Sequence, residues 1–521
     1  MFTHNTSPPR CILLGLLAAL PAIAVGCGEN ADSDDSSSGG NGGTPCVSCG
    51  GDGGSGGTGG TGGSGTDGGV GGSGAVGGTG GSGGHEQPEG IDNPAKLGGC
   101  TVEDPRTPPL AALPVVPHID EVYVVDTDKW NIPTDGSDPE RTSAGLSEAL
   151  AWAVDNGFGT VRLPAGAYVV GREINSMFIE GVVVPGPLRL DFEPGAIIQM
   201  KPNDHPFYCI LDIADASDVW IRGGTVLGDR ESHQYVGEST HEFGTAVCVG
   251  SRGGSERILI ENMSLAEATG DGITINDAPG SSRDITIRGN DIHHHRRQGI
   301  SIISGSAIVI EDNEIHHIAG TAPQFGIDIE TTLKDNVNRD ILIWWNTFYQ
   351  NQGGDYVNTD GHNVWLLHNS MDQTGLEEKQ TDGPIIFWHK SDQVIRHNTV
   401  VSTVGNSNGM WALVSYPLGA SPEVPNIIED NVFTHGGINI GGGEGDSMLS
   451  SVKIARNVVD QHNFVVAYTS CTQFDDNEVN EDGEIYYPYI FRDVYGLASG
   501  NKHNGAPVDI PLSPNEPYNH P

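Results

Sequence analysis

The chain has 521 residues and a formal net charge of −42, because 68 Asp and Glu residues outnumber 26 Lys and Arg residues. Nucleic acids and anionic membranes bind basic surfaces, so this charge excludes a protein that coats either polyanion. Only 36% of the residues are apolar, while 75 are Gly, and 26 of these glycines lie between residues 39 and 84. The composition therefore separates a segment that cannot fold alone from roughly 420 residues that are enough for a large core.

The first 27 residues have the pattern of an export signal. Residues 1–10 are polar with one Arg, residues 11–24 are apolar, and small residues precede Cys27. An apolar run of about 14 residues is too short to span a bilayer as a helix, which favours a cleaved signal. The segment Ala-Val-Gly-Cys that ends at Cys27 resembles a bacterial lipoprotein lipobox, which implies lipidation of Cys27 and an outer-membrane or cell-surface location. Ordinary secretion without lipidation is the alternative.

Residues 28–98 are predicted to be a flexible linker. They are mainly Gly, Ser, Thr and Asp, so the segment cannot bury enough apolar surface to offset the entropy of ordering. Cys46 and Cys49 lie in this linker, and a disulfide between them or with Cys100 is preferred to a zinc site in an oxidising compartment. Three further cysteines lie in strand-like runs and are expected to be buried apolar residues: Cys209, Cys248 and Cys471.

A phrase of alternating β-branched residues that ends in Asn recurs through the rest of the chain. Its copies end at Asn262, Asn290, Asn313, Asn346, Asn369, Asn398, Asn431, Asn457 and Asn477. A second phrase recurs from Ala246 to Phe464 at a step of about 27 residues, whereas propeller blades need about 40 to 45. Short alternating strands without helices between them predict an all-β fold, a right-handed single-stranded parallel β-helix. The Asn side chains are expected to form a hydrogen-bonded ladder at one bend of the coils.

The β-helix domain is predicted to span residues 99–505, followed by a Pro-rich tail at residues 506–521. An open β-helix end exposes unpaired strand edges and needs a cover. Thr142-Ser143, followed by apolar residues at helical spacing, predicts an N-terminal capping α-helix near residues 143–156.

The sequence that follows the predicted helix is Thr-Val-Arg-Leu-Pro-Ala-Gly-Ala-Tyr, which ends at Tyr168. The helix and this phrase together resemble the N-terminal cap of pectate-lyase-like proteins and phage tailspikes. The resemblance covers residues 118–505 and is specific for the fold, not for the substrate.

Charged residues recur in phase in five consecutive coils. The phrases G-D-R-x-x-H, T-H-E-F-G, D-G-I, R-R-Q-G-I-S and G-I-D-I-E resemble a set found together in bacterial and prophage-encoded β-helix proteins. Thr331 stands where that set usually has Pro. The resemblance implies a surface polysaccharide as the substrate without specifying the reaction.

Asp328 and Glu330 are the candidate catalytic carboxylates. They are two residues apart in a strand whose Ile327 and Ile329 face inward, so both are expected to point outward, with Cα atoms about 6.7 Å apart. Glycoside hydrolysis needs two carboxylates, so we assign Glu330 as the acid and Asp328 as the base or nucleophile. Arg297, one coil earlier, is expected to reach the same face and orient the carboxylates or substrate.

Other residues of these phrases are candidates for binding the substrate. They are Asp229, Arg230, His233, His241, Glu242, Asp271, His295 and Arg296. A buried polar network that shapes a loop is the alternative for Asp229, Arg230 and His233. His293, His294 and His295 are expected to diverge at a turn, so no metal ligand is assigned to them.

Two alternatives to hydrolysis stay open. A polysaccharide lyase would take the proton with Arg297 or His241 and hold Ca²⁺ with Asp271, Asp328 and Glu330. A non-catalytic glycan-binding or structural module would stack sugars on Trp344 or Trp345, one of which is expected to point inward. Hydrolysis itself requires no cofactor.

The expected partner is a polysaccharide. The predicted lipid anchor is the expected contact with a membrane, and a nucleic-acid partner is not expected. The protein is expected to be a monomer or a homotrimer.

Overall fold

The computed structural model describes residues 102–520 with the exception of 276–281, 333–335, 377–382, 389–391, 403–409, 414–423, 442–447, 484–486 and 515. The predicted export signal with Cys27, the linker with Cys46 and Cys49, and Cys100 lie outside these residues. The described part of the chain contains no helix with the length and apolarity needed to span a membrane.

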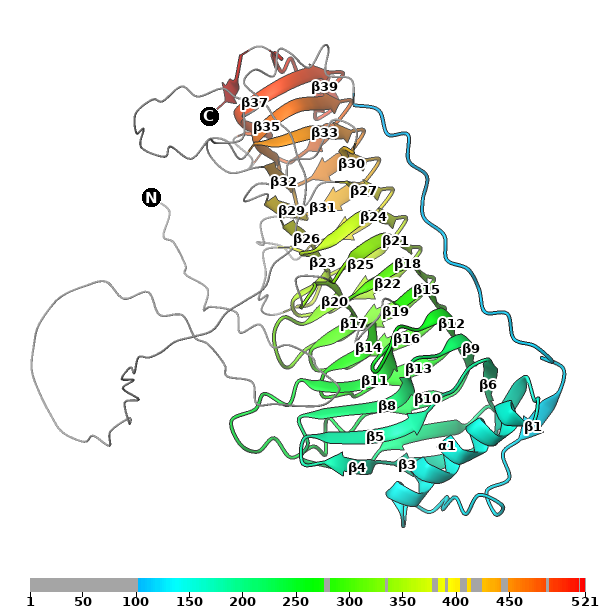
Figure 1. Ribbon diagram of the computed structural model, residues 1–521. Helices are drawn as coiled ribbons and strands as arrows, with labels where there is room; N and C mark the ends of the chain where they lie inside the picture. Colours follow the sequence, from blue (N-terminus) through cyan, green and yellow to red (C-terminus); the bar gives the residue numbers. More distant parts are fainter. Residues whose placement is uncertain are drawn as a thin grey trace, which may run out of the picture. The chain divides into compact units, whose positions relative to one another are not determined.

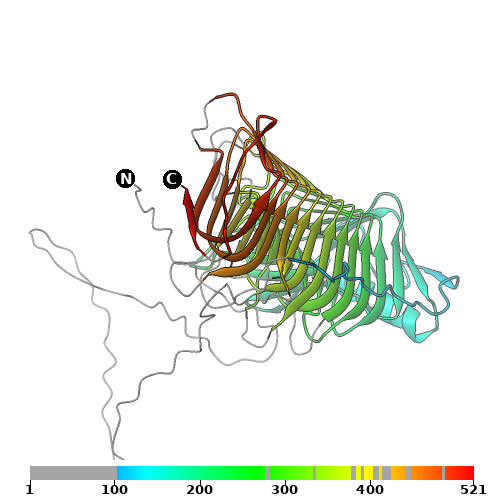
Figure 2. The ribbon, with the colours of Figure 1, turned by 90° about the horizontal axis from the view of Figure 1, so that it is seen from above.

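The described residues form a right-handed parallel β-helix, as the sequence predicts (Figures 1 and 2). Successive coils stack along one axis, and each coil contributes strands to three faces, here called faces A, B and C. Face A contains β5 (Phe178–Val183), β8 (Phe207–Ile213), β11 (Phe243–Val249), β14 (Asp271–Ile275), β17 (Gln298–Ile302), β20 (Phe325–Ile329), β23 (Gly354–Asn358), β26 (Ile385–Trp388), β29 (Met410–Leu413) and β32 (Ile438–Gly441).

Face B contains β1 (Val122–Val124), β2 (Thr160–Leu163), β6 (Leu188–Phe192), β9 (Ser217–Arg222), β12 (Glu256–Glu261), β15 (Ser282–Arg288), β18 (Gly305–Glu311), β21 (Asn338–Trp344), β24 (Gly361–Leu367), β27 (Gln393–Arg396), β30 (Asn426–Glu429) and β33 (Leu449–Ala455). Faces A and B merge at β35 (Phe464–Asp475) and β37 (Tyr489–Ser499), which pair with each other. Two edge strands pair antiparallel with these faces: β4 (Arg172–Asn175) with β5, and β40 (Tyr518–His520) with β37.

Face C contains β3 (Gly166–Val170), β7 (Ala196–Met200), β10 (Thr225–Leu227), β13 (Ser264–Ala266), β16 (Asp291–His293), β19 (Glu314–His316), β22 (Thr347–Tyr349), β25 (Ser370–Asp372), β28 (Thr399–Val401), β31 (Val432–Thr434), β34 (Val458–Asp460), β36 (Glu478–Asn480), β38 (Lys502–His503) and β39 (Ala506–Pro507). The predicted tail at residues 506–521 therefore supplies two short antiparallel strands, β39 and β40, which the sequence analysis missed.

The inward positions of the strands carry β-branched residues that stack on one another. On face B, for example, Ile258, Ile285, Ile308 and Ile341 are in direct register and have no exposed surface. Such a column buries one apolar side chain per coil and face, so the core extends along the whole axis.

The α-helix α1 (Pro139–Asp155) lies at the N-terminal end, where it contacts β3, β4 and β5 (Figure 1). It begins earlier than predicted, because Asp138 is the N-cap and accepts a hydrogen bond from the Arg141 amide at 3.0 Å. Thr142 and Ser143 are instead buried within the helix. The Ser143 hydroxyl accepts a hydrogen bond from the Gly171 amide at 2.8 Å and so ties the helix to the first coil.

The predicted Asn ladder runs from Asn290 to Asn501. Each side-chain amide donates to the Oδ1 of the next Asn at 2.9 to 3.2 Å. The assignment of Asn262 is corrected: Met263 holds the ladder position, and its amide donates to Asn290 Oδ1. Asn262 occupies the preceding position, which has a left-handed backbone with φ of 54°.

Residues 102–116, which we call the N-terminal arm, run along the outside of face B from the last coils towards the cap (Figure 1). The Val102 amide donates to Gln473 of β35, and the Val115 amide donates to Asp218 of β9. Near its start the arm covers an apolar cluster on the outward side of face B. The buried members of this cluster are Val102, Val309, Leu342, Trp365, Leu367, Val394, Ile427 and Cys471.

The two adjacent tryptophans do not match the expectation that one of them points inward. Ile343 takes the inward position, and Trp344 packs against the apolar cluster under the arm. Trp345 is 55% exposed at a bend with φ of 58°.

Candidate functional site

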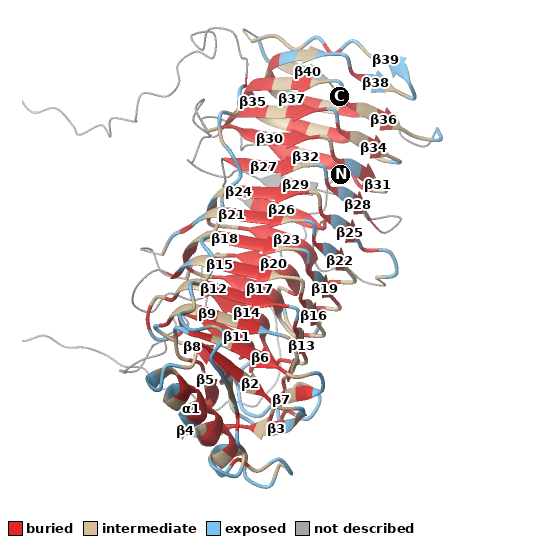
Figure 3. Cartoon of the chain, turned by 90° about the vertical axis from the view of Figure 1, so that its right-hand side faces the viewer, coloured by how far each residue is buried: buried red, intermediate tan, exposed pale blue. Residues whose placement is uncertain are grey.

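The outward side of face A carries a column of polar side chains that come from distant parts of the sequence. The strand register aligns Asp212, Cys248, Thr274, Ser301 and Asp328. A second pair in register, Asp271 and Gln298, lies three residues upstream on β14 and β17. All residues of β14, β17, β20 and β23 are buried, on the outward as well as on the inward side (Figure 3).

Asp271 and Arg297 form an ion pair on this face. Arg297 Nη1 lies 3.0 Å from Asp271 Oδ2, which also accepts hydrogen bonds from the hydroxyls of Ser301 at 2.8 Å and Thr274 at 3.3 Å. Asp271 is 4% exposed. Burial raises the pKa of Asp271, and the charge of Arg297 and the two hydroxyls only partly oppose that shift.

Asp328 is held by the neighbouring coil. Gln298 Nε2 donates to Asp328 Oδ2 at 2.5 Å, and Gln298 Oε1 accepts from the Phe325 amide at 2.9 Å. Because Gln298 has no exposed surface, its amide orients the Asp328 carboxylate rigidly. Glu330 lies just beyond the end of β20, is half-buried, and is more accessible than Asp328.

Four carboxylates lie near enough to Arg297 to act on its pKa, and one of them, Asp271, contacts it directly. Burial lowers the pKa of Arg297, but the charges of Asp271, Asp328, Glu242 and Glu330 outweigh burial and raise it. We call these five residues the Arg297 cluster. The predicted trio of Asp328, Glu330 and Arg297 thus lies on one side of the β-helix, together with Asp271 and Glu242.

The loop between β10 and β11 contains a buried chain of hydrogen bonds. Asp229 Oδ2 lies 2.8 Å from His233 Nδ1, and His233 Nε2 lies 2.8 Å from His241 Nδ1. The other nitrogen of His241 is 2.7 Å from the carbonyl oxygen of Val236, and His241 is 2% exposed. These side chains shape the loop from inside, so Asp229 and His233 form the buried polar network given above as their alternative, and His241 belongs to the same network.

Two arginines join this loop to the segment between β16 and β17. Arg230 Nη1 donates to the carbonyl oxygen of His294 at 2.6 Å. Arg296 Nη1 donates to the carbonyl oxygen of Thr240 at 2.8 Å, and its guanidinium lies over the Tyr235 ring at 4.5 Å. Both side chains therefore have contacts within the protein that explain their positions.

His295 also lies inside the protein. Its Nδ1 accepts a hydrogen bond from the Ala268 amide, and its Nε2 lies 2.9 Å from the carbonyl oxygen of Leu265. The side chain has no exposed surface, and burial lowers its pKa to about 3. The assignment of His295 to the groove is corrected, since the ring links two coils as a neutral group.

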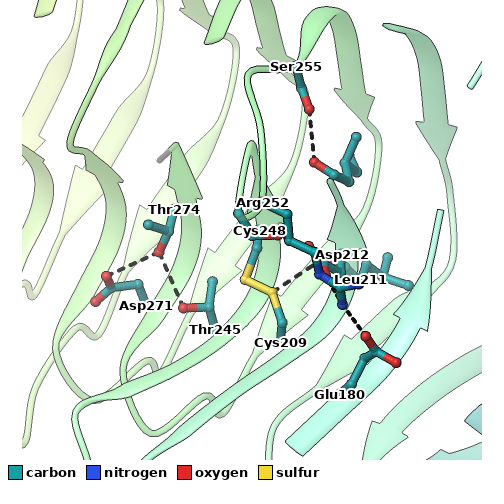
Figure 4. Close-up of a disulfide and its surroundings, with 12 residues drawn as sticks. Glu180, Cys209, Leu211, Asp212, Thr245, Cys248, Arg252, Ser255, Asp271 and Thr274 are labelled. Atoms are coloured by element: carbon teal, nitrogen blue, oxygen red, sulfur yellow. Dashed lines mark hydrogen bonds and ion pairs between the residues drawn. A yellow bond between two sulfur atoms is a disulfide. The ribbon is translucent and has the colours of Figure 1, made fainter. Parts of the chain in front are cut away.

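Cys209 of β8 and Cys248 of β11 form a disulfide with Cα atoms 6.1 Å apart (Figure 4). The cysteines are buried, as predicted, but their bond was not predicted, because residues 39 apart become neighbours only once the coil register is known. Arg252 bonds both Asp212 and Glu180 beside the disulfide. The charged surface of face A thus continues towards the cap.

An open depression of about 430 Å³ lies elsewhere, on face B of the first coils. Its lining consists of Arg162, Arg189, Asp191, Phe192, Glu193, Pro194 and Arg222. Arg189 and Arg222 both pair with Asp191, at 2.6 and 3.4 Å, so these charges already compensate one another.

Three histidines are the one group of potential metal ligands that converges within the described residues. Ligand atoms of His294, His316 and His317 all lie within 4.8 Å of one another. Among the residues that the structure describes, the carboxylates of the Arg297 cluster do not converge closely enough to form a second such group.

The model of the family described as "Right handed beta helix region" matches residues 225–400. The uncharacterized protein YclG of Bacillus subtilis (strain 168) is 28% identical over 274 residues, which are 48% of this chain and 46% of YclG. The SPbeta prophage-derived uncharacterized protein YorA of the same organism is 32% identical over 228 residues, 40% of this chain and 38% of YorA. The chain therefore spans less than half the length of these curated relatives.

Among solved structures, the A-module of the mannuronan C-5 epimerase AlgE6 of Azotobacter vinelandii superposes with a TM-score of 0.50. The sequence identity is 16%, and the match covers 74% of this chain and all of that module. At this identity the likeness supports the fold alone.

Proposed function

We propose that this protein is an exported glycoside hydrolase that cleaves a polysaccharide on face A. The observation that carries the proposal is the Arg297 cluster, in which four consecutive coils bring one guanidinium and four carboxylates to the same part of face A. The mannuronan C-5 epimerase module has the same fold, so a polysaccharide substrate is compatible with this scaffold.

The surroundings of the two candidate carboxylates differ in a way that suits hydrolysis. Asp328 accepts a hydrogen bond from the rigid Gln298 amide, which holds its carboxylate in one orientation and suits a base or nucleophile. Glu330 is the more accessible carboxylate and suits the acid that protonates the leaving oxygen. Arg297, fixed by Asp271, acts as a positioning residue for both.

The contacts of the proposed bases weigh against the lyase alternative. Arg297 has a raised pKa because of the surrounding carboxylates and is thus a poor proton acceptor. His241 is buried and hydrogen-bonded through both ring nitrogens. A Ca²⁺ ion held by Asp271, Asp328 and Glu330 would have to sit beside the guanidinium of Arg297, where charge repulsion opposes it.

A release assay on a panel of polysaccharides tests the proposal. Hydrolysis predicts new reducing ends, and Asp328→Asn and Glu330→Gln should each lower the rate about 10²- to 10⁴-fold. Asp340→Asn on face B is the matched control and should keep full activity, because Asp340 lies outside the Arg297 cluster, its side chain is 42% exposed, and its left-handed backbone tolerates Asn.

Other outcomes of the same assay reject hydrolysis. Absorbance from an unsaturated uronate would identify a lyase, and retention of the polysaccharide without release would identify a binding module. Folded Asp328→Asn and Glu330→Gln variants with undiminished turnover would remove these carboxylates from the mechanism.

Lipidation of Cys27 and a surface location belong to the same proposal. Mass spectrometry of the mature protein should find an N-terminal Cys27 that carries acyl chains. An unmodified N-terminus downstream of Cys27 would indicate secretion without an anchor.

A further inference from the structure

A second cluster of functional groups lies on face C, outside the Arg297 cluster. The dipeptides His293-His294 and His316-His317 occupy the same place in adjacent coils, because His293 of β16 pairs in register with His316 of β19. His293 stacks on His316 with ring centroids 5.1 Å apart, and His294 stacks on His317 at 4.7 Å. We call these four residues the histidine ladder.

The backbone at the bend turns the rings of each dipeptide towards each other. His294 and His317 have φ of 56° and 55°, the left-handed conformation that follows each short strand here. As a result, His293 Nδ1 lies 2.8 Å from His294 Nδ1, and His316 Nδ1 lies 2.6 Å from His317 Nδ1. Only His295 of the original triplet diverges, as the sequence analysis expected for all three.

A carboxylate fixes the protonation of the central ring. Asp291 Oδ1 lies 2.9 Å from His316 Nε2, so this nitrogen carries the hydrogen and donates it. The lone pair of His316 is therefore on Nδ1, on the side of His317. A carboxylate bonded to the far nitrogen of a histidine is the usual way in which proteins orient a metal ligand.

The rings are accessible enough to bind a cation. His294 and His317 are half-buried, so an ion has a route from solvent. Neutral imidazoles suit Zn²⁺, Cu²⁺ and Ni²⁺, whereas Ca²⁺ and Mg²⁺ prefer oxygen ligands.

We propose that the histidine ladder binds one divalent first-row transition-metal ion through His294, His316 and His317. The ligand atoms lie within 4.8 Å of one another, so small ring rotations bring each within bonding distance of one ion. The ion would cross-link two adjacent coils at their bend, and this role is independent of the proposed hydrolysis.

Calorimetric titration with Zn²⁺ of the full protein, produced without a polyhistidine tag, tests the proposal. The wild type should bind one ion with a dissociation constant in the micromolar range or below. His317→Asn should weaken binding at least tenfold, and Asn is chosen because it tolerates the left-handed backbone of this position.

His368→Asn is the matched control. His368 has φ of 54° and stacks on His397 with centroids 4.6 Å apart, but no third histidine, cysteine or carboxylate joins this pair as a converging ligand within the described residues. The control should bind Zn²⁺ like the wild type. Equal loss in His368→Asn and His317→Asn, or no loss in His317→Asn, would overturn the proposal.

A second measurement uses the wild-type protein and therefore does not require any variant to fold. Crystals of the wild type soaked in Zn²⁺ should give an anomalous scattering peak within bonding distance of His316 Nδ1 and of a nitrogen of His317. A peak elsewhere, or none at the histidine ladder, would also overturn the proposal.

Discussion

At the scale of single residues, the buried Asn of each coil replaces the backbone hydrogen bonds that a sharp bend cannot make. Asn346 accepts from the amide and side chain of Asn313 and donates to the carbonyl oxygen of Ile310 and to Asn369. It is 1% exposed, so no water can take over these bonds. Each Asn therefore stabilises the coil before it and the coil after it.

The substitution Asn346→Ala should be strongly destabilising. It leaves buried donors and acceptors in two coils without partners, and each such group costs about 1 to 3 kcal/mol. We expect the free energy of unfolding, measured by urea titration, to fall by about 2 to 4 kcal/mol. Asn519→Ala is the control, because Asn519 is exposed and water can replace its bond to the Asp493 amide. Similar losses in both variants would contradict the importance of the ladder.

Asp271 makes the stability depend on pH in a defined direction. Burial raises its pKa above the ordinary value of 3.8, so protonation favours the folded state. Its contribution to the free energy of unfolding is therefore largest below the pKa of the unfolded chain and is lost as the pH rises through the folded-state pKa. Asp271→Asn removes this contribution.

Urea titrations of the wild type and Asp271→Asn at several pH values test the direction. The difference in free energy of unfolding should shift in favour of the wild type as the pH falls. A shift in the opposite direction would mean that the ion pair with Arg297 outweighs burial, so that the folded-state pKa is lowered.

At the scale of elements, the sequence predicts the repeats because their spacing is regular and local. Alternation predicts the strands, and the recurring Asn predicts the ladder, although the position of Asn262 is shifted by one residue. The cap helix is predicted too, but Asp138 begins it instead of Thr142. Contacts between coils were harder to predict, since the disulfide and the Gln298–Asp328 bond depend on register and not on local pattern.

The same limit applies to the candidate site. The grouping of Asp328, Glu330 and Arg297 follows from counting coils, and the structure brings the three together. The burial of His241 and His295 cannot be predicted from the sequence. His241 lies in a loop and His295 in a turn, where no periodic pattern shows whether a side chain points inward or outward. The histidine ladder was missed because its signal is the recurrence of His-His in the next coil, which only the register reveals.

The N-terminal arm is an element that no periodicity predicts, and one side chain anchors it. Arg106 donates to the carbonyl oxygens of Asp392 and Pro425, both at 2.7 Å, and to Asp104. Its guanidinium lies 5.8 Å from the Trp365 ring centroid. Because Arg106 joins the arm to two successive coils, it should control whether the arm stays bound.

Arg106→Ala should release the start of the arm. We expect faster hydrogen exchange in the peptide that covers residues 102–112 and a loss of roughly 1 to 3 kcal/mol in the free energy of unfolding, since charge-assisted bonds are removed. Arg339→Ala is the control, because Arg339 lies on the face B strand β21 and its side chain is 63% exposed. Unchanged exchange in the arm of Arg106→Ala would show that apolar contacts alone hold it.

At the scale of the whole described β-helix, stability is a sum of similar contacts between neighbouring coils. The Arg297 cluster lies in the middle of this stack, on β14 to β20, where every coil has a neighbour on both sides. Its geometry therefore depends on the register of these coils and on the end of the β10–β11 loop, which contributes Glu242. The two ends of the stack are protected in different ways.

The N-terminal end of the β-helix is covered by a larger element than the C-terminal end. Helix α1 packs on the first coils, and Trp152 of the helix contacts Tyr123 with ring centroids 5.0 Å apart. In the described part of the chain, the C-terminal end is covered by the short strands β39 and β40, both paired antiparallel, and by the segment between them, whose Ile510 is buried in the core. Because a 17-residue helix covers the N-terminal end and only short segments cover the other, the C-terminal coils should open first.

Hydrogen exchange followed by mass spectrometry tests this order. Peptides that cover β36 and β38 should exchange before those that cover β16, β19 and β22, and peptides of β2 and β6 should be protected like the centre. Arg106→Ala should accelerate exchange in β35 further, because Val102 of the arm is bonded to Gln473. Exchange that begins at β2, or equal protection along the axis, would contradict this order. It would mean that α1 does not protect its end of the β-helix better than β39 and β40 protect theirs.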